Sequence, residues 1–209
     1  MVDVNWMLKT IVCTLGRTAT GKTTISKYLA SSLGVSYISE GEIKRALVHQ
    51  NKEYDVNDCL DEALRDIAYE EAVRKAKSIL CSSDCVIIDA SFHKFKRRQL
   101  VYDLAHSIGG YVVFLYTICR DISIIQKRIM NRKTQDKTYE THADSFRVYE
   151  YINATFDEPT YDEIRSNAAT VIEISTSIRD VRISLCANES REANEINSKI
   201  MGVINGYLC

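Results

Sequence analysis

The sequence predicts an α/β domain in which helices cover both faces of a five-stranded parallel sheet. Short apolar runs rich in β-branched residues alternate along the chain with stretches of helical period. The 209 residues include a single proline, Pro159, and no glycine- or serine-rich linker, so one domain over residues 1–209 is expected. The predicted strands are Ile11–Leu15, Val35–Ile38, Val86–Ile88, Tyr111–Tyr116 and Val171–Ile174.

Two long helices stand out by the spacing of their apolar residues. The first carries an apolar stripe between Leu60 and Leu80. The second is a C-terminal closing helix over about residues 178–208, because Ser177–Asp180 resembles a capping box. Its stripe consists of Ile196, Ile200, Val203, Ile204 and Leu208. This stripe either closes the domain or serves a homodimer, so monomer and homodimer both stay open.

The composition is that of an ordinary globular protein, with 45% hydrophobic and 26% charged residues and a formal net charge of −1. That charge argues against a surface built for nucleic acid. No apolar run approaches the roughly 18 residues of a membrane span, and the N-terminus resembles a strand more than a signal peptide. We therefore expect a cytoplasmic protein without membrane contact. Seven irregularly spaced cysteines favour buried free thiols over a metal or redox pair at Cys81 and Cys85.

Residues Gly16–Thr23 match the phosphate-loop pattern G-x-x-x-x-G-K-[ST] without a gap. They follow a predicted strand and precede a helical run, where backbone N–H groups and the helix N-terminus can face a phosphate. Lys22 is placed to reach the β- and γ-phosphates, and the Thr23 hydroxyl to bind magnesium. We therefore predict ATP and Mg²⁺ as ligands. The residues expected to contact the nucleotide here are Gly16, Thr18, Ala19, Thr20, Gly21, Lys22, Thr23 and Thr24.

An acidic and a basic side chain, Glu42 and Arg45, follow the second strand. They lie at the edge where ligands bind in parallel sheets. Glu42 is placed to accept a proton from an attacking hydroxyl, and Arg45 to hold an anionic group of the acceptor. The alternative for Glu42 is an ordinary acid at a helix start.

The run Glu40-Gly41-Glu42-Ile43-Lys44-Arg45 resembles the Asp-Gly-Asp-x-x-Arg segment of small P-loop kinases. That group includes adenylylsulfate kinase, the 5′-kinase of polynucleotide kinase, zeta-type toxins and seryl-tRNA kinase. The resemblance implies a three-layer P-loop NTPase fold of the nucleoside-kinase type. Each aspartate of the pattern is a glutamate here, which leaves the role of Glu42 as general base open.

The third strand ends in a single acid, Asp89, near the expected metal. Asp89 is predicted to support Mg²⁺ through its waters or to orient the acceptor, with a plain strand-end turn residue as the alternative. The following segment, residues 90–98, holds five basic residues counting His93. Its Arg-Arg pair resembles that of the seryl-tRNA and polynucleotide kinases, and Arg98 is predicted to bind the acceptor. Lys94 and Lys96 are interpreted as a solvated helix face.

Arg128 and Arg132 lie four residues apart, hence on one helix face. Mobile arginines commonly supply positive charge in phosphoryl transfer, so this pair is predicted to close over the γ-phosphate from a lid at about residues 128–145. Generic surface arginines are the alternative. By resemblance alone, Thr176 lies near the adenine, and Phe156–Pro159 matches a segment that follows the lid in seryl-tRNA kinases, without a chemical role.

These residues predict an ATP-dependent kinase that phosphorylates a hydroxyl. The predicted catalytic residues are Lys22, Glu42, Asp89, Arg128 and Arg132. The alternative is a nucleotide-dependent accessory ATPase of an RNA-modifying assembly. Nucleosides, coenzyme precursors, sugar alcohols, aminoacyl-tRNA and RNA ends with a 5′-hydroxyl all stay open as acceptors. The near-neutral charge favours a small acceptor over a long polyanion.

Overall fold

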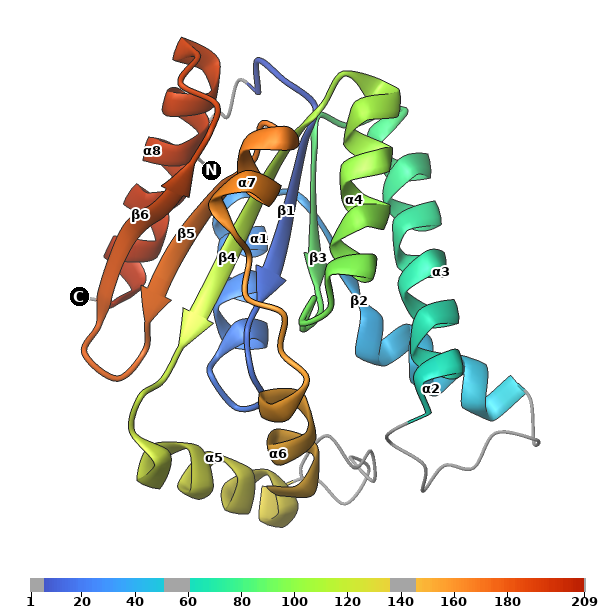
Figure 1. The fold of residues 1–209 in the computed structure, drawn as a ribbon, viewed down its shortest axis with the longest axis vertical. Coiled ribbons are helices and arrows are strands. Elements are labelled where there is room, and N and C mark those ends of the chain that lie inside the picture. The colour runs from blue at the N-terminus through green and yellow to red at the C-terminus, as the bar shows by residue number, and fades with distance from the viewer. Residues whose placement is uncertain (1–5, 51–60, 136–145, 209) are drawn as a thin grey trace.

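The structure is a computed structural model that describes residues 6–50, 61–135 and 146–208. Helices and strands alternate along these residues (Figure 1). The strands are β1 (Thr10–Leu15), β2 (Ser36–Ser39), β3 (Cys85–Asp89), β4 (Tyr111–Ile118), β5 (Thr170–Ser175) and β6 (Asp180–Cys186). The helices are α1 (Lys22–Leu33), α2 (Glu40–Gln50), α3 (Glu62–Leu80), α4 (Phe95–Ile108), α5 (Ile122–Gln135), α6 (Phe146–Ala154), α7 (Tyr161–Ser166) and α8 (Arg191–Leu208).

One sheet of six strands, in the order β2-β3-β1-β4-β5-β6, forms the middle layer. All pairs from β2 to β5 are parallel, which confirms the predicted α/β fold and places the five predicted strands side by side. In this order β1 lies between β3 and β4, so the loop after β1 leaves the sheet between the ends of its two neighbours. This is the edge at which ligands of open parallel sheets bind.

The sixth strand corrects the prediction of a helix over residues 178–208. β6 pairs antiparallel with β5 at the sheet edge, and α8 begins only at Arg191. Three consecutive residues of β6, Arg182, Ile183 and Ser184, are exposed, so the strand has neither the continuous apolar run of a buried strand nor a clean alternation. An edge strand of this kind carries little periodic signal.

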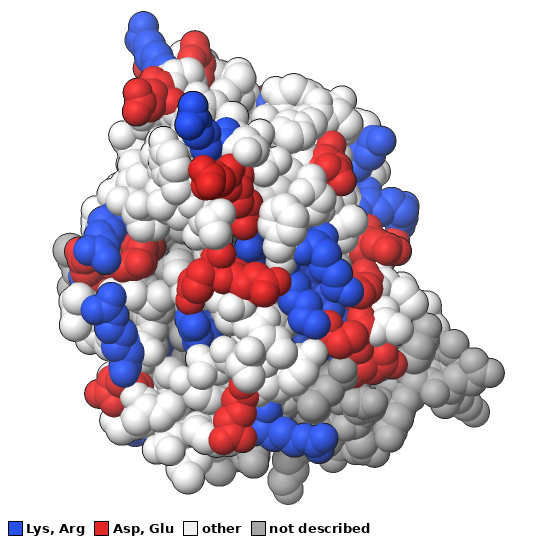
Figure 2. Space-filling view, viewed as in Figure 1, with Lys and Arg blue, Asp and Glu red and all other residues white. Residues whose placement is uncertain are grey.

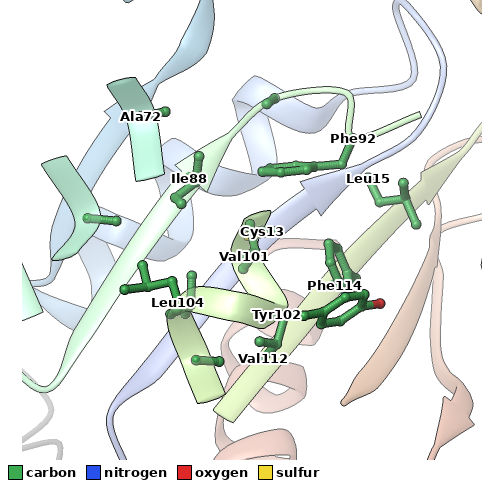
Figure 3. Close-up of a cluster of buried hydrophobic side chains, with 14 of the residues drawn as sticks. Cys13, Leu15, Ala72, Ile88, Phe92, Val101, Tyr102, Leu104, Val112 and Phe114 are labelled. Atoms are coloured by element: carbon green, nitrogen blue, oxygen red, sulfur yellow. The ribbon is translucent and has the colours of Figure 1, made fainter. Parts of the chain in front are cut away.

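Strand residues point alternately to two apolar clusters, one on each face of the sheet. On one face Ile11, Cys13 and Leu15 of β1 pack with residues of α3 and α4. On the other face Val12 packs with residues of α1 and α8. Figure 3 shows the first cluster, in which Phe92 and Tyr102 flank Phe114, each ring edge-on to it. The sheet is therefore covered on both sides, as a three-layer fold requires.

Two further expectations concern membranes and cysteines. None of the helices in the described ranges is long and apolar enough to cross a membrane. Cys81 is exposed and Cys85 is buried, and both are free thiols. Among the described residues no group of three or more metal-ligating side chains occurs around them or elsewhere.

Arg98 holds two helices together instead of facing a ligand, which corrects its predicted role as an acceptor contact. The residue is 0% exposed, and its guanidinium donates from Nε and Nη2 to the two carboxylate oxygens of Glu163 at 2.7 and 2.8 Å. Nη1 donates to the carbonyl oxygens of Phe92 and Asp157 at 3.0 and 2.8 Å. These contacts join α4 to α7 and leave the guanidinium turned into the protein interior.

We predict that Arg98→Met lowers the free energy of unfolding by about 3 kcal/mol, because it leaves the Glu163 carboxylate buried without its cation. Urea unfolding followed by circular dichroism measures this loss. Arg191→Met removes an exposed ion pair with Glu195 and serves as the control, which should unfold almost as the wild type does. A loss for Arg98→Met no larger than that of the control would contradict the structural role.

Candidate active site

The loop between β1 and α1 passes so close to β4 that its first residue must lack a side chain. A Cβ atom added at Gly16 would lie 2.4 Å from the carbonyl oxygen of Thr117, and the φ of Gly16 is +139°. The Gly16 N–H donates to the carbonyl oxygen of Ser91 at 3.1 Å. Gly21 also has a positive φ, of +104°. Only glycine adopts these conformations without strain, so the loop forms the cradle expected for a polyphosphate.

Lys22 lies across this cradle at the start of α1. Its Nζ donates to the carbonyl oxygens of Gly16 at 3.0 Å and Arg17 at 2.6 Å. Gly21 is the N-cap of α1 and supplies no side-chain hydrogen bond to the first turn of the helix. A helix N-terminus at the end of such a loop is a favourable place for a phosphate. Thr23 and Thr24 are exposed in this first turn, whereas Thr18, Ala19 and Thr20 are buried within the loop.

Arg128 and Thr176 contact the loop from α5 and from the residue that follows β5. Arg128 Nη1 donates to the carbonyl oxygen of Ala19 at 3.0 Å and to Thr176 Oγ1 at 3.1 Å. Thr176 Oγ1 in turn donates to the carbonyl oxygen of Thr20 at 2.9 Å. Both residues thus meet at the loop, and closure of Arg128 over a γ-phosphate stays a prediction.

The rest of the predicted lid is described only in part. Arg132 lies within α5, but its side chain is not among the described ones, and residues 136–145 lie outside the described ranges. The predicted roles of Arg132 and of the lid therefore stay predictions.

Asp89 is held rigidly at the carboxyl end of β3. Its side chain is buried, and its two oxygens accept hydrogen bonds from Thr14 Oγ1 at 3.0 Å and from the Tyr37 hydroxyl at 2.8 Å. Burial, with the charge of Asp89, raises the pKa of Tyr37, so this hydroxyl stays a donor. The fixed carboxylate of Asp89 and the hydroxyl of Thr23 are ligands that suit Mg²⁺. This ion keeps several waters and binds largely through substrate phosphates.

The acid that faces this region is Glu40, and Glu42 is turned elsewhere. Glu42 is exposed and lines a hollow of about 440 Å³ with Tyr37, Ile43 and the second half of α3. The half-buried Glu40, by contrast, is close enough to Asp89 and Arg65 for their charges to affect its titration. Burial raises the pKa of Glu40, and the charge of Arg65 opposes that rise. Both acids lie in the first turn of α2, and the predicted role of Glu42 as general base stays a prediction.

A buried ionic cluster lies between α3 and α4, next to the segment that follows Asp89. Arg97 is 1% exposed and donates from Nε and Nη2 to Asp66 and from Nη2 to Glu62. Lys94 donates to Glu62 at 2.6 Å, and Lys96 pairs with Asp66. Burial alone would raise the pKa of Glu62, but the hydrogen bond from Lys94 and the charge of Arg97 outweigh it and lower this pKa to about 2. Lys94 and Lys96, interpreted as a solvated face, are therefore parts of this cluster.

Arg17 of the phosphate loop binds the segment whose role the sequence left open. Its guanidinium lies 4.4 Å from the centre of the Phe156 ring and donates to Glu158 and to the Tyr116 hydroxyl, each at 3.0 Å. Nε donates to Asn153 of α6 at 2.7 Å. Phe156 and Glu158 thus fasten the end of α6 to the phosphate loop.

Sequence reasoning missed Arg17, Tyr37, Glu40 and Arg97 as members of this region. Arg97 is the neighbour of the predicted Arg98. Because successive side chains of an α-helix point about 100° apart around its axis, the two arginines face different elements. Arg45 is half-buried in α2, and its predicted contact with the acceptor stays a prediction.

Comparison with solved structures supports the same fold. A candidate kinase from Chloroflexus aurantiacus is 16% identical with a TM-score of 0.65, covering 94% of this chain and 97% of its own. Kti12 of Chaetomium thermophilum, solved with ADP-AlF3, is 15% identical with a TM-score of 0.60, covering 93% and 98%. A sugar kinase from Janibacter is 14% identical with a TM-score of 0.55, covering 93% of each chain. At these identities the likeness concerns the fold alone.

Fold and phosphate loop together define a P-loop kinase, a class that uses ATP. Residues 3–196 match the family model described as 6-phosphofructo-2-kinase, and the chain belongs to that family. It is 26% identical over 195 residues to the 6-phosphofructo-2-kinase/fructose-2,6-bisphosphatase of Gallus gallus. That alignment covers 86% of this chain and 40% of the chicken protein, so the chain spans about two fifths of this relative.

We predict that Gly16→Ala weakens ATP binding at least 100-fold, because the new Cβ meets the Thr117 carbonyl at 2.4 Å and displaces the loop. Gly109→Ala is the matched control, since Gly109 also has a positive φ but nothing lies within 4 Å of the added atom. Titration calorimetry with Mg·ATP should show wild-type affinity for the control alone. Equal affinities for the two variants would contradict the predicted close approach.

We also predict that Glu62 contributes to the acid stability of the fold. Its pKa is about 2 in the folded protein against an ordinary 4.5, so its contribution is fully present above about pH 4.5 and is lost as the pH falls towards 2. In Glu62→Gln the free energy of unfolding should therefore depend less on pH between about pH 5 and 2 than in the wild type. Urea unfolding at several pH values measures both slopes, and parallel curves would contradict the pairing.

Proposed function

We propose that this chain transfers the γ-phosphoryl group of ATP to a hydroxyl of a phosphorylated sugar, with fructose 6-phosphate as the first candidate acceptor. The observation that carries the proposal is the buried guanidinium of Arg97, which packs on Tyr69 next to the segment whose Ser91 carbonyl accepts the Gly16 N–H. Its Nη1 atom has no hydrogen-bond partner among the described residues. Membership of the 6-phosphofructo-2-kinase family supplies the identity of the candidate.

Arg97 suits an acceptor that already carries a phosphate. A guanidinium matches the geometry of phosphate oxygens, and in a site with little water its charge is poorly screened. The cluster around it contains Lys94 and Lys96, and Arg65 lies at 3.9 Å from Glu62. With Arg97 itself the cluster holds four cations. They face the carboxylates of Glu62 and Asp66, and Glu40 lies within range of the charges of Arg65 and Arg97, so one positive charge is left for an anion.

The overall charge pattern favours a small anion over a long one. In Figure 2, basic and acidic side chains are interspersed on the face shown, without a broad region of one sign. With a formal net charge of −1, the chain lacks the surplus of cations that long polyanions usually require. The cations around Arg97 are instead gathered at one place, which suits a single phosphate group better than a long chain of them.

In the proposed reaction the phosphate loop and the N-terminus of α1 hold the polyphosphate, and Lys22 exchanges its carbonyl partners for phosphate oxygens. Mg²⁺ bound beside Thr23 would neutralise phosphate charge. Asp89, fixed by Thr14 and Tyr37, orients the metal's waters or the acceptor hydroxyl. Arg128 and Arg132 close over the γ-phosphate. The new P–O bond forms to the acceptor oxygen as the bond to ADP breaks, and the proton of that hydroxyl passes to the Asp89 carboxylate. Positioning and charge supply most of the catalysis.

The test is transfer of label from γ-labelled ATP in the presence of magnesium. Fructose 6-phosphate, glucose 6-phosphate, unphosphorylated fructose and tRNA are offered separately. We expect a labelled sugar bisphosphate from fructose 6-phosphate, and at most weak labelling of fructose. Release of labelled inorganic phosphate with no labelled acceptor would contradict the proposal and favour the accessory ATPase.

We further predict that Arg97→Met raises the KM for the phosphorylated acceptor about 10- to 100-fold while the KM for ATP stays unchanged. Arg182→Met is the control, because it removes the same kind of side chain from β6, where the exposed Arg182 pairs with Glu173 outside the cluster. Steady-state kinetics measure both constants, after thermal unfolding has established that each variant is folded. Equal KM values for the acceptor in the two variants would contradict the role of Arg97.

A further inference from the structure

Three side-chain atoms in the described residues are buried without a hydrogen-bond partner, and all three belong to one cluster. They are Glu62 Oε1, His93 Nε2 and Arg97 Nη1. His93 and Arg97 are 0% and 1% exposed. Buried polar atoms are nearly always paired, because an unpaired one keeps its desolvation cost without compensation. Glu62 Oε1 still has the Arg65 guanidinium at 3.9 Å, so His93 Nε2 and Arg97 Nη1 are the two donors of the cluster that a ligand oxygen would satisfy.

The hydrogen bonds around His93 favour one of its two neutral tautomers. The Tyr69 hydroxyl oxygen accepts from the backbone N–H groups of Ser91 and Phe92 at 3.1 and 3.0 Å. Its own proton is then directed to Ser91 Oγ, at 3.0 Å. Ser91 Oγ lies 2.8 Å from His93 Nδ1. In the arrangement in which Ser91 passes its own proton on to Nδ1, the relay runs in one direction from Tyr69, and Nε2 carries the hydrogen of the neutral ring.

The electrostatic surroundings keep this ring neutral. Burial lowers the pKa of His93, and the nearby charges of Arg97 and Arg65 lower it further, to about 3. Burial likewise raises the pKa of Tyr69 to about 12, so the tyrosine keeps the proton that starts the relay. At neutral pH the unpartnered Nε2 atom is therefore an N–H donor that bears no charge.

The backbone holds this donor next to the phosphate loop. The carbonyl oxygen of Ser91 accepts the Gly16 N–H, and the carbonyl oxygen of His93 accepts the N–H of Asp157 at 2.8 Å. Between them Phe92 has a φ of +44°, which a bulky residue rarely adopts. The Phe92 ring is packed against Tyr69 and Phe114, with ring centres 5.0 and 6.0 Å apart. Strain held in this way positions the side chain that follows it.

We propose that His93, held as its Nε2–H tautomer by the relay from Tyr69 through Ser91, is a specificity-determining residue that donates a hydrogen bond to an anionic oxygen of the acceptor substrate. The inference rests on the proposed function and extends it by one residue. Arg97 Nη1, the other unused donor of the cluster, gives the acceptor a charged contact, and His93 adds a directed neutral one. A neutral donor discriminates by geometry, because its bond weakens steeply with angle.

Two substitutions separate this role from mere packing. The side-chain amide nitrogen of glutamine reaches about where Nε2 lies, whereas that of asparagine lies nearer Nδ1. We expect His93→Gln to keep the KM for fructose 6-phosphate within about threefold, and His93→Asn to raise it about 10- to 100-fold. The KM for ATP and kcat should change little in either variant. Equal acceptor KM values for the two variants would overturn the inference.

Nitrogen NMR of the full chain labelled at histidine tests the tautomer without turnover. We expect His93 to carry its proton on Nε2, and that proton signal to shift when inorganic phosphate or fructose 6-phosphate is added. A proton on Nδ1, or no shift with either probe, would overturn the inference even if fructose 6-phosphate is phosphorylated. If phosphate shifts the signal but no sugar phosphate takes label, the proposed acceptor fails while the donor role of His93 holds.

Discussion

The close approach between Gly16 and β4 is the constraint on which the candidate site depends. At this point the chain leaves β1 with no room for a Cβ atom beneath the Thr117 carbonyl, and its N–H binds the Ser91 carbonyl beyond β3. The phosphate loop, the β4 end and the segment after Asp89 are thereby joined through backbone atoms. A loop held at both neighbours keeps its N–H groups in place before a ligand arrives, which reduces the entropy lost on binding.

Four arginines near this constraint differ in role because they differ in burial and partners. Arg98 is enclosed and fully paired, so it joins α4 to α7. Arg97, its neighbour in sequence, turns to α3 and keeps one donor atom unused. Arg17 fastens the segment after α6 to the phosphate loop, while Arg128 braces the loop from α5. Identical side chains thus serve structure and loop support within one small region, and one of them keeps a donor for the proposed acceptor.

The sequence predicted the layers and the phosphate loop because both depend on local patterns. Buried parallel strands are short apolar runs, and the loop motif has fixed spacing, so Ile11–Leu15 and Gly16–Thr23 could be recognised directly. β6 could not be recognised in this way, because an exposed edge strand has neither a continuous apolar run nor a motif of fixed spacing. The choice of Arg98 over Arg97 depended on helix phase, because one residue turns the side chain by about 100° around the helix axis. The hydrogen-bond relay from Tyr69 to His93 joins residues 24 positions apart and leaves no sequence signal.

A crystal structure of the chain with a non-hydrolysable ATP analogue, magnesium and fructose 6-phosphate would test the central claim most directly. The account predicts that Lys22 Nζ leaves the carbonyl oxygens of Gly16 and Arg17 for the β- and γ-phosphates. The sugar phosphate should then lie on Arg97 Nη1 and His93 Nε2, with a sugar hydroxyl directed at the γ-phosphate. A nucleotide bound away from residues 16–23, or a sugar phosphate bound elsewhere while both donors stay unpaired, would contradict it.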